Sequence, residues 1–381
     1  QGIRQMIYTN SQPNDPLFPA YSVLSPHEQV HPRRTEERAT SVFNEISFSA
    51  ARGQTEIAGV DIYAWGDAGP HPETFWLGYA VGLSAAWRPG SPDPKELAHS
   101  FYRLYYGRGT SAMDRLYQLM STQAQFYGSS WDREPAGNEP LIFGYSYGIG
   151  PFTPQHSVLA LPPVPEGAFL RLRGDSGREN ARRTELAWKF LGENDELLNL
   201  LYRNLPSVEF NRYNLEVYLS LAKVCRQNLL LFQHLDEIAK SLEEARESAG
   251  KLRYPEALAA LDKAIETAQR IRDERNDALA QLTAIWYKTW FPRVREGNGR
   301  HAPREPIQFV SMGTSESARR RQEGLLYVFE RQFALPFGEW VNEVIAVRNR
   351  YAVAHDLPEQ PMTFDWQDAT TLRSVSVDRD L

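Results

Sequence analysis

The chain of 381 residues contains a single cysteine, Cys225, and no long run of apolar residues. A lone cysteine excludes a disulfide within the chain and any metal or redox motif built from cysteine pairs. Because Cys225 lies in an apolar helical run, we interpret it as a small buried hydrophobic residue and not as a nucleophile. A membrane-spanning helix needs about 20 consecutive apolar residues, so the sequence predicts no membrane span.

Excess charge of one sign is also scarce, because 42 Lys and Arg residues stand against 48 Asp and Glu residues, for a net charge of −6. No segment collects the positive charge that a phosphate backbone attracts, which argues against nucleic acid as the main partner. No HExxH or Walker sequence is present, and we expect neither a cofactor nor a bound metal. Aromatic residues, by contrast, are numerous, with 9 Trp, 18 Tyr and 18 Phe, and they provide enough apolar surface for a folded core.

Up to about residue 91, short apolar strands alternate with turns and helices. We predict strands at residues 3–9 and 57–65 and helices at residues 35–51 and 73–87. Such βα alternation is typical of a parallel sheet or an α/β barrel. The loop at residues 10–32 is longer than a connection usually is unless it has a function, and in βα barrels such loops form the active face.

In the second predicted strand, aliphatic residues alternate with polar or aromatic ones. The aliphatic set is Val60, Ile62 and Ala64, and the other set is Asp61, Tyr63 and Trp65. Since alternate side chains point to opposite faces of a strand, we expect the first set to pack beneath helices and the second to face the interior of a barrel. Apolar residues fill the interior of an ordinary barrel, so an inward Asp-Tyr-Trp set indicates a binding function.

After about residue 180, helical periodicity continues with little interruption by Pro or Gly. Helices are predicted at residues 211–250 and 255–296, each about 60 Å long at 1.5 Å per residue. The short break between them favours an antiparallel hairpin, and its apolar stripes, which include Leu215, Leu242 and Leu261, are interpreted as core. The predicted fold class is therefore an α/β barrel fragment, comprising the last βα units of a TIM-type barrel, followed by a mainly α-helical domain with this long hairpin.

Three neighbouring runs begin at the end of the second predicted strand. They are residues 63–67 (Tyr-Ala-Trp-Gly-Asp), residues 72–76 (Pro-Glu-Thr-Phe-Trp) and residues 78–87, an Ala-rich run that closes in Trp. Together they resemble the last strand and last helix of the catalytic barrel in glycoside hydrolase family 20, the β-N-acetylhexosaminidases. In that family the eighth strand ends in Trp-Gly-Glu or a close variant. Residues 92–107 are similar to the helix that commonly follows.

Two later runs, at residues 211–216 and 290–294, are similar to the helical C-terminal extension of some bacterial relatives. The resemblance implies three parts of the chain. Residues 1–107 would be the C-terminal portion of a (β/α)8 glycosidase barrel, residues 108–180 a helix with a surface-wrapping loop, and residues 181–381 an α-helical C-terminal domain.

The resemblance also implies that the first six barrel strands lie upstream of Gln1, together with the family's catalytic Asp-Glu pair. This chain would then contain no catalytic residue and would be inactive alone. Family members are retaining enzymes that use the substrate's own 2-acetamido oxygen as nucleophile. The implied function is that of the C-terminal part of an exo-β-N-acetylhexosaminidase, and the family favours a bacterial periplasmic or secreted location.

Four residues receive a substrate-binding role from the resemblance: Trp65, Asp67, Tyr8 and Tyr63. The Trp65 indole would form a flat wall against the apolar face of the sugar. The Asp67 carboxylate, which stands where the family more often has Glu, would accept two strong, charge-assisted hydrogen bonds from neighbouring hydroxyls. Tyr8, at the end of the preceding strand, matches the phenol that the family offers to the acetamide oxygen, and Tyr63 shares a strand face with Trp65.

Two other functions stay open at this point. The first is another carbohydrate-active barrel, such as the hyaluronidase-like family 84 type or an α-glucuronidase, in which Trp65 and Asp67 would bind a different sugar. The second is a non-catalytic helical interaction module. The expected partner is an N-acetylhexosaminide substrate, and a homo-oligomer is compatible with the sequence.

Overall fold

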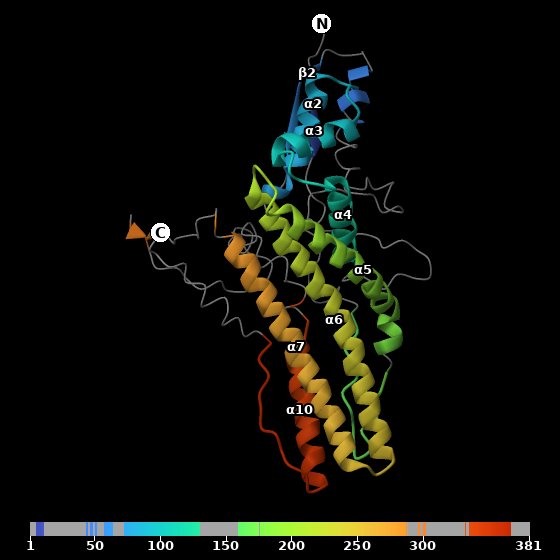
Figure 1. Ribbon diagram of the computed structural model, residues 1–381. Helices are drawn as coiled ribbons and strands as arrows, with labels where there is room; N and C mark the ends of the chain where they lie inside the picture. Colours follow the sequence, from blue (N-terminus) through green and yellow to red (C-terminus); the bar gives the residue numbers. More distant parts are fainter. Residues whose placement is uncertain are drawn as a thin grey trace.

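The structure, a computed structural model, is mostly helical (Figure 1). It describes residues 5–10, 43–51 without 45 and 49, 57–63, 72–129, 159–286 without 175, 288, 296–297, 300–301, 332 and 335–366. The long helices lie side by side, and a small sheet with the shorter helices lies at one end of them (Figure 1).

The sheet is formed by β1 (Gln5–Asn10) and β2 (Ile57–Tyr63), which pair in parallel. Both predicted strands are therefore confirmed, with small shifts at their ends. Val60 and Ile62 are partly buried and pack against the helical core, whereas Asp61 is exposed. The predicted alternation is confirmed at these positions, because the aliphatic side chains of β2 are the ones that contact helices.

The predicted α/β barrel fragment is wrong. Among the described residues the parallel sheet has only the strands β1 and β2, and the two-residue strands β3 (Glu296–Gly297) and β4 (Arg300–His301) form a separate antiparallel pair. A TIM-type barrel closes with eight parallel strands. The βα alternation of the sequence reports each strand and its helix, but it does not report how many strands join the same sheet. Here helices, not further parallel strands, pack against this sheet in the described chain.

Four helical elements follow the sheet: η1 (Pro72–Thr74), α2 (Trp76–Trp87), α3 (Pro94–Tyr106) and α4 (Met113–Ser129). The Asp93 carboxylate caps α3 by accepting a hydrogen bond from the Lys95 main-chain N–H at 2.9 Å. Gly107 ends this helix with a φ of 93°, and a Cβ at this position would lie 2.5 Å from the Cβ of Glu209. The glycine is therefore required both by the backbone and by the close approach of a later segment.

Four long helices form the rest: α5 (Ser176–Asn204), α6 (Arg212–Gly250), α7 (Tyr254–Trp286) and α10 (Phe337–Ala354). The predicted antiparallel hairpin is confirmed, since α6 and α7 are joined by a short turn and pack along their lengths. Lys223, early in α6, donates to Gln281, late in α7, at 2.6 Å. The described part of α7 ends at Trp286, ten residues before the predicted end at 296.

The buried apolar residues form two clusters among the described residues. One joins the sheet, α2, α3, α4 and the last part of α5 to the first half of α6 and the last part of α7, and it contains Leu215 and Cys225. The other joins α5 and α10 to the remaining parts of α6 and α7, and it contains Leu242 and Leu261. The interpretation of Cys225 as a buried residue is confirmed. In the part of the chain that the structure describes, none of the helices has the length and apolar character needed to traverse a bilayer.

Candidate functional site

The carboxyl edge of the small sheet is where the predicted site residues begin. Tyr8 lies in β1 opposite Asp61, and Tyr63 ends β2 opposite Asn10. Because the two strands are parallel and in register, both end at the same edge of the sheet. The chain that continues to Trp65 and Asp67 therefore leaves β2 beside the end of β1, although these two residues lie outside the described residues. Ligands of parallel sheets typically bind at this edge.

Glu73 in η1 is the first described residue after β2 that bonds to the helices by its side chain. Asn214 of α6 donates from Nδ2 both to the Glu73 main-chain oxygen, at 2.8 Å, and to its Oε2, at 2.9 Å. The Tyr105 hydroxyl of α3 donates to the same carboxylate at 3.3 Å, and the Tyr218 hydroxyl of α6 donates to the Glu73 main-chain oxygen at 3.2 Å. The segment between β2 and η1 thus has the sheet at one end and two helices at the other.

Further tyrosines complete this polar cluster. Tyr106 donates from its hydroxyl to Asn214 Oδ1 at 2.6 Å and lies 2.7 Å from the Tyr117 hydroxyl of α4. Tyr106, Tyr117, Asn214 and Tyr218 are all buried. We call the set of Glu73, Tyr105, Tyr106, Tyr117, Asn214 and Tyr218 the Glu73 anchor. A buried polar network in which the groups satisfy one another is rigid and specifies one arrangement of its elements.

Burial determines the protonation of the phenols in the Glu73 anchor. It raises the pKa of Tyr105, Tyr106 and Tyr218 far above the usual value of a phenol, and the nearby Glu73 carboxylate raises the pKa of Tyr105 and Tyr218 further. These hydroxyls therefore stay protonated at neutral pH and can donate hydrogen bonds. The chemical capacity of the Glu73 anchor is to join η1 to α3, α4 and α6.

Sequence reasoning missed the Glu73 anchor. In the sequence, Asn214 belongs to the run at residues 211–216. An amide beside Leu215 on the apolar face of a helix predicts a buried hydrogen-bond network, because a buried amide needs hydrogen-bond partners. That signal does not identify the partner. Glu73 lies 141 residues earlier in the chain, and only the packing of α6 against η1 brings the two together.

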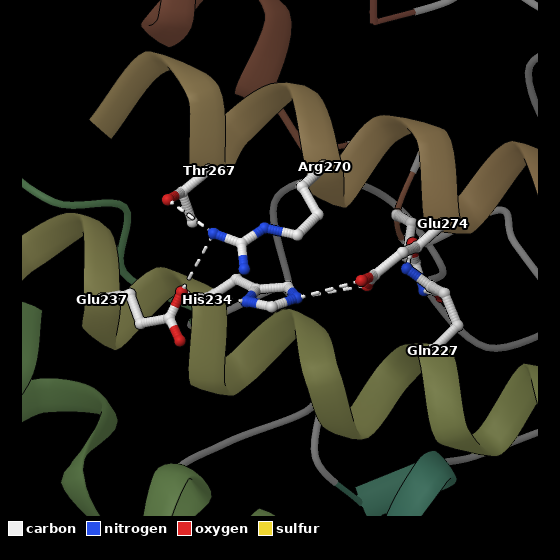
Figure 2. Close-up of polar contacts among 7 residues, drawn as sticks. Gln227, His234, Glu237, Thr267, Arg270 and Glu274 are labelled. Carbon is white, nitrogen blue, oxygen red and sulfur yellow. Dashed lines mark hydrogen bonds and ion pairs between the residues drawn. The ribbon is translucent and has the colours of Figure 1, made fainter. Parts of the chain in front are cut away.

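A second polar cluster lies between α6 and α7 (Figure 2). The buried His234 ring has Glu237 Oε2 at 3.2 Å from Nδ1 and Glu274 Oε2 at 3.2 Å from Nε2. Arg270 donates to Glu237 at 3.4 Å and to Thr267 at 3.1 Å. Within the described ranges, no group of three or more His, Cys, Asp or Glu side chains could hold a metal ion. We interpret this cluster as a polar link that fixes the register of the hairpin.

Comparison with known proteins found no family model, no curated protein and no solved structure that matches this chain. The roles of its residues must therefore be argued from their chemistry and geometry. The carboxyl edge of β1 and β2, together with the Glu73 anchor, is the candidate site that results.

Proposed function

We propose that this chain is the C-terminal part of a glycoside hydrolase that removes terminal N-acetylhexosamine residues, and that Trp65 and Asp67 form part of its sugar subsite. The observation that carries the proposal is the parallel, in-register pairing of β1 and β2, which ends both strands at one edge. Residues that follow two such strands are close together, as a site for a single sugar ring requires. The proposal needs this edge and not a closed barrel within the chain.

The residue types at this edge suit a sugar. An indole offers a broad apolar face to the C–H groups of a pyranose, and a carboxylate can accept hydrogen bonds from two adjacent hydroxyls. We assign the first role to Trp65 and the second to Asp67. Tyr8 would donate to the acetamide oxygen, and Tyr63 would contribute to the wall of the subsite.

Catalysis in this proposal is substrate-assisted. The 2-acetamido oxygen attacks the anomeric carbon while a general acid protonates the leaving oxygen, so that retention results without an enzyme nucleophile. No residue of this chain is assigned to proton transfer. As the resemblance to family 20 implies, the acid Glu and the Asp that orients the acetamide would come from an earlier part of the catalytic domain.

The Glu73 anchor suggests what the helices contribute to such a site. Asn214 and Tyr218 come from α6, and both donate to Glu73 just after the segment that contains Trp65 and Asp67. A subsite must hold its side chains within a fraction of an ångström of the productive geometry. We assign to α3 and α6 the function of positioning that segment.

Replacement of Trp65 by alanine tests the subsite. In the full-length protein, Trp65→Ala should lower kcat/KM on an aryl β-N-acetylglucosaminide by at least about tenfold, because tenfold corresponds to about 1.4 kcal/mol of transition-state binding. Trp188→Ala is the matched control, since Trp188 is an exposed tryptophan on α5. Equal kinetics for the two variants would reject the assignment of Trp65.

A non-catalytic interaction module is the second candidate, and one surface favours it. Trp76, Leu83 and Trp87 are exposed on α2, and their spacing of seven and four residues places them on one face of the helix. Contiguous exposed apolar surface is typical of interaction sites. Cleavage of the aryl substrate by the full-length protein would favour the first candidate, and its absence together with specific capture of a protein by α2 would favour the second.

A further inference from the structure

The helix α2 contains no charged residue, although one of its faces is in contact with solvent. Its inner face packs into the core through residues such as Val81 and Ala85. On the outer face, Trp76 is 44% exposed, Leu83 60% and Trp87 89%. A surface helix normally has a polar outer face, and a helix that is apolar all round is normally covered on all sides. The outer face of α2 is therefore expected to pack against a partner.

The outer face of α2 consists of four residues in one narrow stripe: Trp76, Ala80, Leu83 and Trp87. At 3.6 residues per turn they fall within about 60° of one another around the helix axis. The intervals between them are four, three and four residues, so the stripe has the same spacing when it is read from either end. We call these four residues the α2 stripe.

This reversible spacing matters because a two-fold axis pairs residue i of one copy with residue j of the other, and j with i. An antiparallel crossing of two copies about the middle of α2 places Trp76 opposite Trp87 of the partner subunit. The same crossing places Ala80 opposite Leu83 of the partner subunit, so that a small side chain meets a large one. Close packing across a helix pair requires such matching of sizes.

The charges that flank α2 favour the same orientation. Glu73 precedes the helix in η1, and the exposed Arg88 follows its last residue. Antiparallel copies bring the acidic end of one helix beside the basic end of the other, whereas parallel copies would bring like charges together. Complementary charges of this kind determine the orientation of partners more than they determine affinity.

The apolar area of the α2 stripe limits how strong such an association is. The two tryptophans and Leu83 expose roughly 400 Å² on each copy, about half of the 800 Å² or so per partner in a standard interface. Phe48, which is 59% exposed, follows Ser47, whose hydroxyl accepts a hydrogen bond from the main-chain N–H of Gly90 just after α2 at 2.9 Å. The surface next to the α2 stripe is therefore also apolar, and we expect dissociation in about the micromolar range.

We propose that two copies of this chain form a two-fold dimer in which α2 packs antiparallel against α2 of the partner subunit through the α2 stripe. A stripe with the same spacing from both ends is what a two-fold interface requires, whereas an unrelated partner imposes no such symmetry. The helix lies at the end of the molecule that carries the sheet, remote from α10 (Figure 1). The proposal goes beyond the second candidate function, because it identifies the partner as the same chain, and it does not depend on any sugar-binding activity.

Sedimentation equilibrium of the full chain tests the dimer. Between about 1 and about 100 μM, the molar mass should rise toward twice the 43.5 kDa of one chain. Trp87→Glu should raise the dissociation constant at least about hundredfold, because it replaces a central tryptophan by a carboxylate that the partner's indole cannot solvate. Trp188→Glu, at an exposed tryptophan of α5, is the matched control and should leave the constant unchanged. A wild-type chain that stays monomeric, or equal constants for the two variants, would overturn the proposal.

A charge-rescue experiment tests the antiparallel orientation. Trp76→Lys should also prevent dimerisation by itself. An equimolar mixture of Trp76→Lys and Trp87→Glu chains should restore it, because an antiparallel crossing places the lysine of one chain opposite the glutamate of the other and leaves the two remaining tryptophans opposite each other. Recovery of the dimer also shows that both variants are folded. A mixture that stays monomeric, while each variant alone retains the circular dichroism of the wild type, would overturn the proposed arrangement.

Discussion

Asn214 is one of two α6 residues that donate hydrogen bonds to Glu73 in η1. Its side chain uses both amide hydrogens on Glu73 and its oxygen on Tyr106. The amide has little access to solvent, so water cannot replace these bonds. An aspartate at this position would place a second carboxylate against Glu73. A leucine would remove one of the donors to the Glu73 oxygens and the acceptor of the Tyr106 hydroxyl. The geometry thus requires an amide.

Removal of this amide should destabilise the fold. Asn214→Ala leaves the buried Tyr106 hydroxyl and Glu73 carbonyl short of a partner, and we expect it to lower the free energy of unfolding by about 2 to 3 kcal/mol. Urea denaturation followed by circular dichroism measures the change. Asn199→Ala is the matched control, because Asn199 is an exposed asparagine in the interior of α5 and the two substitutions share the same change in helix propensity. Equal stabilities for both variants would contradict the role of Asn214.

At the scale of elements, an ion pair between the buried Arg348 and the partly exposed Asp262 links α10 to α7. Arg348 donates from Nε and Nη2 to the two carboxylate oxygens of Asp262, at 2.7 and 3.2 Å, and from Nη1 to the Pro358 oxygen at 2.6 Å. The guanidinium thus joins α7, α10 and the segment after α10. A cavity lies between α10 and the turn at residues 164–170. Because this ion pair positions α10, it also maintains that cavity.

Loss of this guanidinium should be costly. Arg348→Met retains much of the apolar stem but leaves Asp262 without its partner, and we expect a loss of about 2 to 3 kcal/mol, less than for a fully buried pair because Asp262 is partly exposed. Arg253→Met, at an exposed arginine after the α6–α7 turn, should leave the free energy of unfolding unchanged. Chemical denaturation measures the free energy of unfolding of both variants. Equal values would show that the ion pair does not stabilise the packing of α10 against α7.

The helices and strands also show which features of the fold the sequence patterns predict. The stripes with Leu215, Leu242 and Leu261 predicted α6, α7 and their antiparallel pairing, because a short turn leaves two helices no other way to bury adjacent faces. The alternation in β2 predicted a strand with Val60 and Ile62 toward the helices. The barrel prediction failed, because strand number depends on partners that no local pattern contains.

At the scale of the whole molecule, α6 and α7 connect the two ends. Their N- and C-terminal halves belong to different buried clusters, and the sheet lies at one end of the two helices while α10 lies toward the other (Figure 1). Neither cluster can lose its order without exposing an apolar face of both helices. The sheet and α10 therefore share one scaffold.

This sharing predicts a single unfolding transition. We expect far-ultraviolet circular dichroism and tryptophan fluorescence to give the same midpoint for the chain in urea, because the two clusters cannot melt separately while α6 and α7 cross both. Asn214→Ala, in the cluster near the sheet, should shift both curves together. Two separated midpoints would instead assign the clusters to independently folding units.

The sequence by itself determined the local structure: the strands β1 and β2, the buried character of Cys225 and the long hairpin. These follow from periodicity, which depends on residues within one or two turns of each other. Only the tertiary structure decided that the parallel sheet has two strands in the described chain, that Asn214 meets Glu73, and that a turn before α5 closes a cavity on α10. Such contacts join residues far apart in the sequence, and they arise from how the apolar faces pack in three dimensions, which no local pattern records.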